Sequence, residues 1–120
     1  MDLETLCKLN YENPPNENIS RKPVVIRAYT DYLETDGPEI FKKNLHEKLS
    51  KDKFYFYINM FPYDVVKPIN HSCLWYKGET NKEEVTKYLN NHNIKYVTFF
   101  ENPEYLKSVK DVSHFHVFHY

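Results

Sequence analysis

The stretch that decides the fold begins at residue 54 and reads Phe54-Tyr55-Phe56-Tyr57-Ile58. Aromatic and β-branched residues in unbroken succession favour a β-strand. Similar runs follow at residues 71–76, 95–100 and 114–120. Between the second and third runs, Thr80 and Glu83 have the spacing of a capping box, which predicts a helix there. The second half of the chain therefore predicts four antiparallel strands with one inserted helix.

The first half of the chain has helical periodicity instead. Apolar side chains recur at steps of one, three and four over residues 24–34 and again over 40–49. The turn signal Asp36-Gly37-Pro38 separates the two stretches. Residues 1–23 are polar and contain Pro14-Pro15, so they are interpreted as an N-terminal arm. We predict an arm at 1–23 and a single α+β domain at 24–120, with two N-terminal helices ahead of the sheet.

Composition excludes several classes of protein. The 120 residues form one small domain, and 16 Lys+Arg against 17 Asp+Glu give a net charge of -1, which argues against nucleic-acid binding. Only two glycines are present, too few for a glycine-rich phosphate loop. No run is long and apolar enough to cross a membrane, and the acidic start lacks a signal peptide. We expect a cytoplasmic protein with two reduced cysteines, and a C-terminal edge strand able to pair in a homodimer.

Histidines in the last strand are the main functional signal. Side chains alternate faces along a strand, so His114 and His116 share one face while His119 lies on the other. His71 opens a neighbouring strand and can complete a cluster of three imidazoles. Such a cluster can divide acid and base roles, bind a metal or clamp a phosphate, and the alternative is one buried and several surface histidines. No acidic or cysteine ligand has a recognisable metal spacing, so we predict no metal and no other cofactor.

Other polar and aromatic side chains have two interpretations each. Asn59 follows the first strand and can form a turn or hold a ligand hydroxyl. Trp75 can stack on a ring of a ligand or belong to the core, and the core is favoured. Asn102 precedes Pro103 in a predicted turn and is a candidate for substrate binding. His46 and His92 are expected on the surface.

Three blocks of the sequence resemble the fungal N-acetylglucosamine-induced protein family, a domain of unknown function. The blocks are residues 56–63 with 69–77 (FYINMFPY and INHSCLWYK), 97–109 (VTFFENPEYLKSV) and 112–118 (VSHFHVF). The resemblance covers about residues 20–120. Met60 stands where that family usually has an Asp.

A weaker resemblance is to the HIT superfamily of nucleotide hydrolases and transferases. It rests on the Asn-x-Phe-Pro turn at Asn59, the strand opened by His71 and the His-x-His strand. The resemblance implies that His116 is a nucleophile with His114 beside it, and that Ser108 lies in a phosphate-facing turn. Phe118 replaces the third histidine of the HIT pattern, so a complete catalytic site is not expected.

Three functions remain open at this stage. The domain can bind a phosphorylated small molecule or nucleotide in a pocket lined by His71, His114 and His116, without complete chemistry. It can be a phosphoester or nucleotide hydrolase or transferase that uses His116 as nucleophile or base, with Asn59 and Ser108 holding the substrate. It can also be a non-enzymatic protein-interaction factor that uses the arm.

Overall fold

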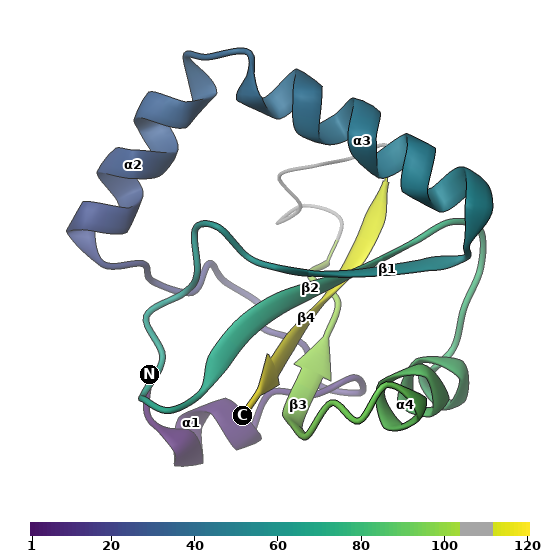
Figure 1. Cartoon of the computed structure of the whole chain (residues 1–120). Helices are drawn as coiled ribbons and strands as arrows, with labels where there is room; N and C mark the ends of the chain where they lie inside the picture. The colour runs from purple at the N-terminus through teal and green to yellow at the C-terminus, as the bar shows by residue number, and fades with distance from the viewer. Residues whose placement is uncertain (104–111) are drawn as a thin grey trace.

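The computed structural model describes residues 1–103 and 112–120, and within them it shows an α+β fold (Figure 1). Its elements are α1 (Leu3–Cys7), α2 (Pro23–Leu33), α3 (Gly37–Lys51), β1 (Phe54–Ile58), β2 (Asn70–Tyr76), α4 (Lys82–Asn91), β3 (Tyr96–Phe100) and β4 (Ser113–His119). The predicted fold class, with four antiparallel strands, is confirmed. A predicted helical turn at Tyr105 and Leu106 lies outside the described residues.

The four strands form one open sheet in the order β1-β2-β4-β3, with every neighbouring pair antiparallel. The C-terminal strand β4 is therefore an inner strand, and the prediction that it forms an edge is wrong. Contiguous sequence could not reveal this, because β3 pairs with β4 on the side away from β2. Between His116 and His119 the backbone of β4 pairs on both sides, so this part of the strand offers no free edge for a homodimer.

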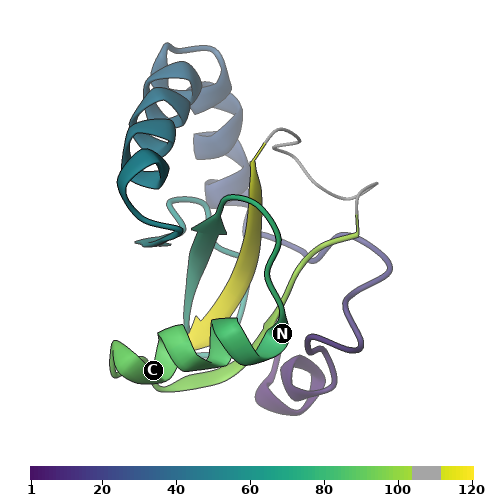
Figure 2. The same cartoon turned by 90° about the vertical axis from the view of Figure 1, so that its right-hand side faces the viewer.

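The two faces of the sheet pack against different helices. Leu74 and Phe115 lie on one face with Val85 and Leu89 of α4. Cys73 and Trp75 lie on the other face with Leu45 and Leu49 of α3. Figures 1 and 2 show α2 and α3 together on one side of the molecule, with α4 away from them in both views.

Helix α2 occupies the predicted stretch, but its apolar stripe does not enter a core. None of its residues is buried. Ile26 is 51% exposed and Leu33 is 55% exposed. Tyr29 and Tyr32 instead place their rings 5.0 Å from the ring of Phe61. The stripe therefore contributes to the wall of a pocket, which is described below.

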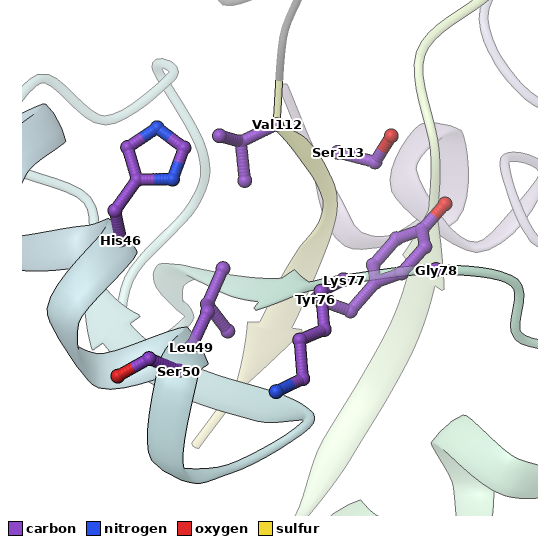
Figure 3. A pocket seen from close by; sticks show the side chains of 8 residues that line it. All are labelled: His46, Leu49, Ser50, Tyr76, Lys77, Gly78, Val112 and Ser113. Atoms are coloured by element: carbon purple, nitrogen blue, oxygen red, sulfur yellow. The ribbon is translucent and has the colours of Figure 1, made fainter.

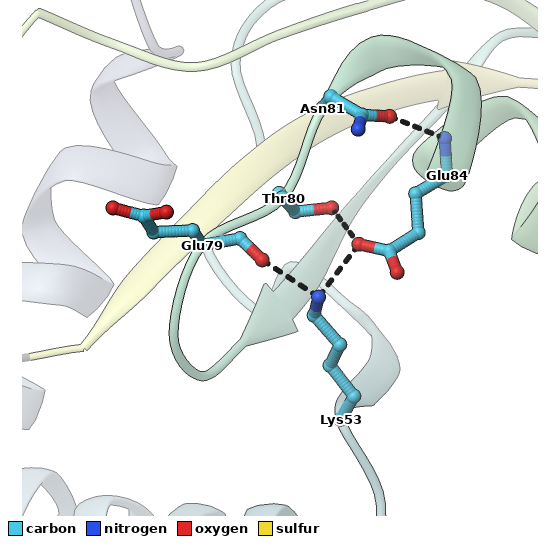
Figure 4. A network of polar contacts seen from close by, with 5 residues as sticks. All are labelled: Lys53, Glu79, Thr80, Asn81 and Glu84. Atoms are coloured by element: carbon cyan, nitrogen blue, oxygen red, sulfur yellow. Dashed lines mark hydrogen bonds and ion pairs between the residues drawn. The ribbon is translucent and has the colours of Figure 1, made fainter.

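Helix α4 begins one residue later than predicted, and its cap also fastens it to β1 (Figure 4). The N-cap is Asn81, whose side-chain oxygen accepts from the backbone N–H of Glu84 at 2.9 Å. Thr80, the predicted cap, donates its hydroxyl to the Glu84 carboxylate at 2.6 Å. That carboxylate also pairs with Lys53 at 2.7 Å, just ahead of β1. The predicted capping box is wrong because Asn81 is the stronger cap.

The first 22 residues pack along the sheet. Leu6 of α1 is fully buried in a cluster with Phe100 and Phe118. Thr98 of β3 donates its hydroxyl to the backbone carbonyl of Leu9 at 2.6 Å. The backbone N–H of Val66 donates to the carbonyl of Met1 at 2.8 Å. The division into an arm at 1–23 and a domain at 24–120 stays a prediction.

No helix among the described residues has the length and apolar character that a membrane span requires.

Candidate functional site

Pleating and register bring the predicted histidines together on the face of the sheet that α3 covers. His71 and Cys73 are two residues apart on β2, and Cys73 lies directly opposite His116 on β4. The ring centres of His71 and His116 are 5.0 Å apart, and those of His114 and His116 are 4.8 Å apart.

His119 is on the opposite face, as predicted, where its Nε2 contacts Ser72 Oγ at 2.8 Å. His46 and His92 are exposed, also as predicted.

All three clustered rings have little exposure. Only 3% of His71, 7% of His114 and 3% of His116 is exposed. Burial lowers the pKa of His71 from 6.5 to about 3, and the positive charge of Arg21 adds to the effect. Burial, with His114 and His71 as the next causes, also holds the pKa of His116 well below 6.5. His71 and His116 are therefore neutral at physiological pH.

Hydrogen bonds connect the cluster to the loops at the carboxyl ends of β1 and β3. His71 Nδ1 accepts from the backbone N–H of Tyr63 at 3.1 Å, and His71 Nε2 lies 2.8 Å from His116 Nδ1. The side-chain amide of Asn102 lies 3.0 Å from His116 Nε2. Asn59 forms the predicted turn, because its Oδ1 accepts from the backbone N–H of Phe61 at 2.8 Å. Its amide nitrogen is directed at the cluster.

A pocket of about 670 Å³ opens between the α2–α3 pair and this face of the sheet. That volume is within the usual range for a small-molecule site. Five predicted site residues line it: Asn59, Trp75, Asn102, His114 and His116. His71 is not among its lining residues; it contacts His116 and borders a separate pocket of about 470 Å³ that Asn59 and Tyr63 also line. Ser108 lies outside the described residues. The roles of all seven in binding or catalysis stay predictions.

Arg21 is a functional candidate that the sequence analysis missed. It lines the pocket, half-buried, and its Nε donates to the carbonyl of Phe61 at 2.7 Å. Its guanidinium carbon lies 4.8 Å from the ring centre of Tyr63 and 5.5 Å from that of Tyr29. No described carboxylate lies within ion-pair distance of it. The residue stands in a polar, Pro-flanked segment, and no local sequence pattern separates it from an ordinary surface arginine.

The charged side chains that line the pocket within the described part of the chain are all basic. Arg21 and Lys42 are among the described residues that line it, and no Asp or Glu is. Aromatic rings supply much of the remaining wall, including those of Tyr32, Phe41 and Trp75. Phe41 and Trp75 pack with ring centres 5.5 Å apart. A cationic, donor-rich and aromatic wall suits an anionic ligand with a planar ring.

The cluster also has the composition of a metal site, but its geometry favours hydrogen bonding. His71, Cys73 and His116 offer ligand atoms within 4.8 Å of one another. Tetrahedral zinc holds two histidine nitrogens about 3.3 Å apart, which is wider than the 2.8 Å contact here. A metal-bound histidine donates its second ring N–H, whereas the second nitrogen of His71 accepts from Tyr63.

Cys73 behaves as part of the core. Burial raises the pKa of its thiol to about 12, so the reactive thiolate is not formed at neutral pH. The Asn59 amide nitrogen lies 3.5 Å from its sulfur. Cys73 was not among the predicted site residues, although its two-residue spacing from His71 places both on one face of a strand.

A second, smaller pocket of about 330 Å³ lies near the C-terminal end of α3 (Figure 3). It is bordered by His46, Leu49 and Ser50 of α3, by Lys77 after β2, and by Val112 and Ser113. None of the predicted site residues borders it. It has no described arginine and no cluster of imidazoles, so the larger pocket is the better candidate site.

These features define a small α+β domain with a buried histidine cluster beside a pocket whose described charged residues are basic. The chain belongs to the family described as "Protein of unknown function (DUF3605)", whose pattern matches residues 12–120. The finer resemblances, to the N-acetylglucosamine-induced family and to the HIT superfamily, stay predictions.

Comparison with solved structures supports the fold. The structure titled "Crystal Structure of HTC1" aligns with a TM-score of 0.59 and 17% sequence identity. The alignment covers 85% of this chain and 76% of that chain. No match is found among curated proteins.

Proposed function

We propose that this domain binds a small phosphorylated molecule with a planar ring, such as a nucleotide, in the pocket between α2–α3 and the sheet. The observation that carries the proposal is the half-buried Arg21, which has no described carboxylate partner and borders a pocket without described acidic residues. A cation removed from water is normally paired, and a ligand phosphate can supply that pair.

Two further features support a phosphorylated ligand. Asn59 and Asn102, which have amide side chains, line the same pocket as Arg21. The rings of Tyr29 and Tyr32 pack against that of Phe61 at inclinations of 34° and 49°, and Tyr29 also lies beside Arg21, so the wall offers aromatic surface to a base or a similar ring. Charge selects the phosphate in this arrangement, and the aromatic wall selects the group attached to it.

Isothermal titration with adenosine monophosphate, a sugar phosphate and their unphosphorylated counterparts tests the proposal. We expect the phosphorylated compounds to bind at least tenfold more tightly, because a charge-assisted hydrogen bond contributes about 1.5–3 kcal/mol. Arg21→Met, which keeps the apolar stem, should abolish this preference. Arg27→Met is the matched control, because Arg27 is an exposed arginine on α2 outside the pocket lining. Equal affinity of Arg21→Met and wild type for the phosphorylated compounds contradicts the proposal.

A catalytic function is the second candidate, because His114 and His116 border the same pocket. A nucleophilic His116 would need a bare Nε2 facing the substrate. The hydrogen bond from His71 to its Nδ1 instead favours a proton on Nε2, so binding without turnover is the better-supported function. Assay of the nucleotide panel with wild type and His116→Ala separates the two. Turnover that disappears in His116→Ala would replace the binding function with the catalytic one.

A further inference from the structure

We infer that His71 is a positioning residue that fixes the proton of His116 on Nε2 and thereby turns the amide of Asn102 so that its NH₂ group recognises a ligand oxygen. The inference deepens the proposed function and rests on it for the identity of the ligand. It makes His71 determine specificity although the residue does not line the pocket. The ligand class that follows is one with acceptor oxygens at this point, as in a phosphate group.

The first step is the anchor at Tyr63. A backbone N–H can only donate, and that of Tyr63 donates to His71 Nδ1 at 3.1 Å. His71 Nδ1 therefore carries a lone pair and no proton. A neutral imidazole has one proton, so that of His71 is on Nε2.

The second step determines which ring nitrogen of His116 carries the proton. His71 Nε2 lies 2.8 Å from His116 Nδ1, a good hydrogen-bond distance. Since His71 is the donor, His116 Nδ1 is the acceptor and carries no proton. The single proton of neutral His116 is then on Nε2, at the end of the ring that meets Asn102.

The third step concerns the amide of Asn102. Its Nδ2 lies 3.0 Å from His116 Nε2 and 3.2 Å from the hydroxyl of Tyr63. A protonated Nε2 and an NH₂ group would be two opposed donors. The oxygen and nitrogen of an amide are nearly interchangeable in shape, so the hydrogen-bond network decides between them. The network places the Asn102 oxygen against His116, where it also accepts from the Tyr63 hydroxyl.

The orientation of the Asn102 amide determines which hydrogen-bonding group it presents to a ligand in the pocket. With the Asn102 oxygen used by His116 and Tyr63, its NH₂ group is left for the pocket that Asn102 lines together with Arg21. Both groups donate hydrogen bonds, and neither accepts. The pair therefore selects an acceptor such as a phosphate oxygen and rejects an ammonium or amide N–H at the same position.

Long-range ¹⁵N–¹H correlation spectra of the ligand-free protein test the tautomers directly. We expect the downfield signal of a bare ring nitrogen at Nδ1 in both His71 and His116. His71→Leu removes the donor and should allow a bare Nε2 in His116. His71→Gln keeps an N–H in the same position and should restore the wild-type pattern. A bare Nε2 on His116 in wild type, or an unchanged His116 pattern in His71→Leu, overturns the inference.

Binding of inorganic phosphate tests the role of the amide. Asn102→Asp keeps an acceptor for His116 but removes the NH₂ group and adds a negative charge. We expect the variant to keep the His116 tautomer and to bind phosphate at least tenfold more weakly than wild type. Unchanged phosphate binding by Asn102→Asp overturns the inference. Absence of phosphate, nucleotide and sugar-phosphate binding in wild type contradicts the proposed function instead, and the spectra still decide the tautomers.

Discussion

His71 and His116 lie on adjacent inner strands with Nε2 of one 2.8 Å from Nδ1 of the other, and both rings are only 3% exposed. Two charged imidazoles cannot share this contact, because the hydrogen bond needs a lone pair on His116 and burial penalises both charges. The pair therefore contributes to stability only while both rings are neutral. The stabilisation that the pair provides should therefore be lost as the pH falls.

We expect stability to fall as the pH falls below 6.5. The folded-state pKa of His71 is lowered from 6.5 to about 3, and that of His116 is lowered in the same direction. Below pH 6.5 the unfolded chain binds protons that the folded chain refuses, so each ring adds a slope of about 1.4 kcal/mol per pH unit. The contribution is complete above pH 6.5. Urea unfolding at several pH values between 7 and 4 measures it.

Matched histidine variants separate this effect from the titration of carboxylates. His116→Gln should flatten the dependence of unfolding free energy on pH, whatever its effect on stability at pH 7. His46→Gln and His92→Gln, which replace exposed rings outside the cluster, are the matched controls. An equal slope in wild type and His116→Gln would show that the ring titrates normally in the folded state.

The two cysteines should differ sharply in reactivity. Cys7 is exposed, whereas Cys73 is buried with its thiol pKa raised to about 12. Since alkylation requires an accessible thiolate, iodoacetamide at pH 8 should modify one site in the folded protein and two in urea. Mass spectrometry counts the modified sites. In Cys7→Ser the folded protein should remain unmodified, and rapid labelling of that variant contradicts the burial of Cys73.

The helices and strands could be predicted from the sequence because each depends mainly on residue types within its own segment. The unbroken aromatic run at 54–58 and the helical spacing at 40–49 are each complete within the segment, and the structure has β1 and α3 there. The shared face of His114 and His116 follows from pleating alone. The sequence indicated that His71 could lie near them if its strand were a neighbour. The pairing of β2 with β4 places it there.

The remaining features depend on contacts between distant parts of the chain. Arg21 borders the site only because the segment before α2 reaches the Phe61 carbonyl, 40 positions away. The inner position of β4 depends on the connection through α4, which places β3 one strand position away from β2 and leaves the place between them for β4. The direction of the hydrogen bond from His71 to His116 depends on the backbone N–H of Tyr63, which donates to His71. None of these features can be predicted from the spacing of residue types along the sequence.

Leu6 should be as important to stability as a residue of the central sheet. It is fully buried against Phe100 and Phe118, although it lies on a helix of five residues. Leu6→Ala should lower the free energy of unfolding by about 2–5 kcal/mol, through lost burial and the cavity left behind. Leu3→Ala on the same helix is the control, because Leu3 is 43% exposed and its loss should cost less than about 1 kcal/mol. Equal and small effects of the two substitutions, measured by urea unfolding, would show that residues 1–23 are a dispensable arm.

The N-cap of α4 gives a last prediction, which tests the observed cap against the predicted one. Asn81→Ala removes the side-chain acceptor for the Glu84 N–H and should destabilise the fold by about 1 kcal/mol (Figure 4). Thr80→Val loses only a hydroxyl bond to a carboxylate that Lys53 also contacts, so its cost should be smaller. Asn91→Ala, at the other end of the same helix, is the control for replacing an exposed asparagine. If Thr80→Val costs more than Asn81→Ala in thermal unfolding, the helix begins at Thr80 in solution, as the capping-box spacing predicted.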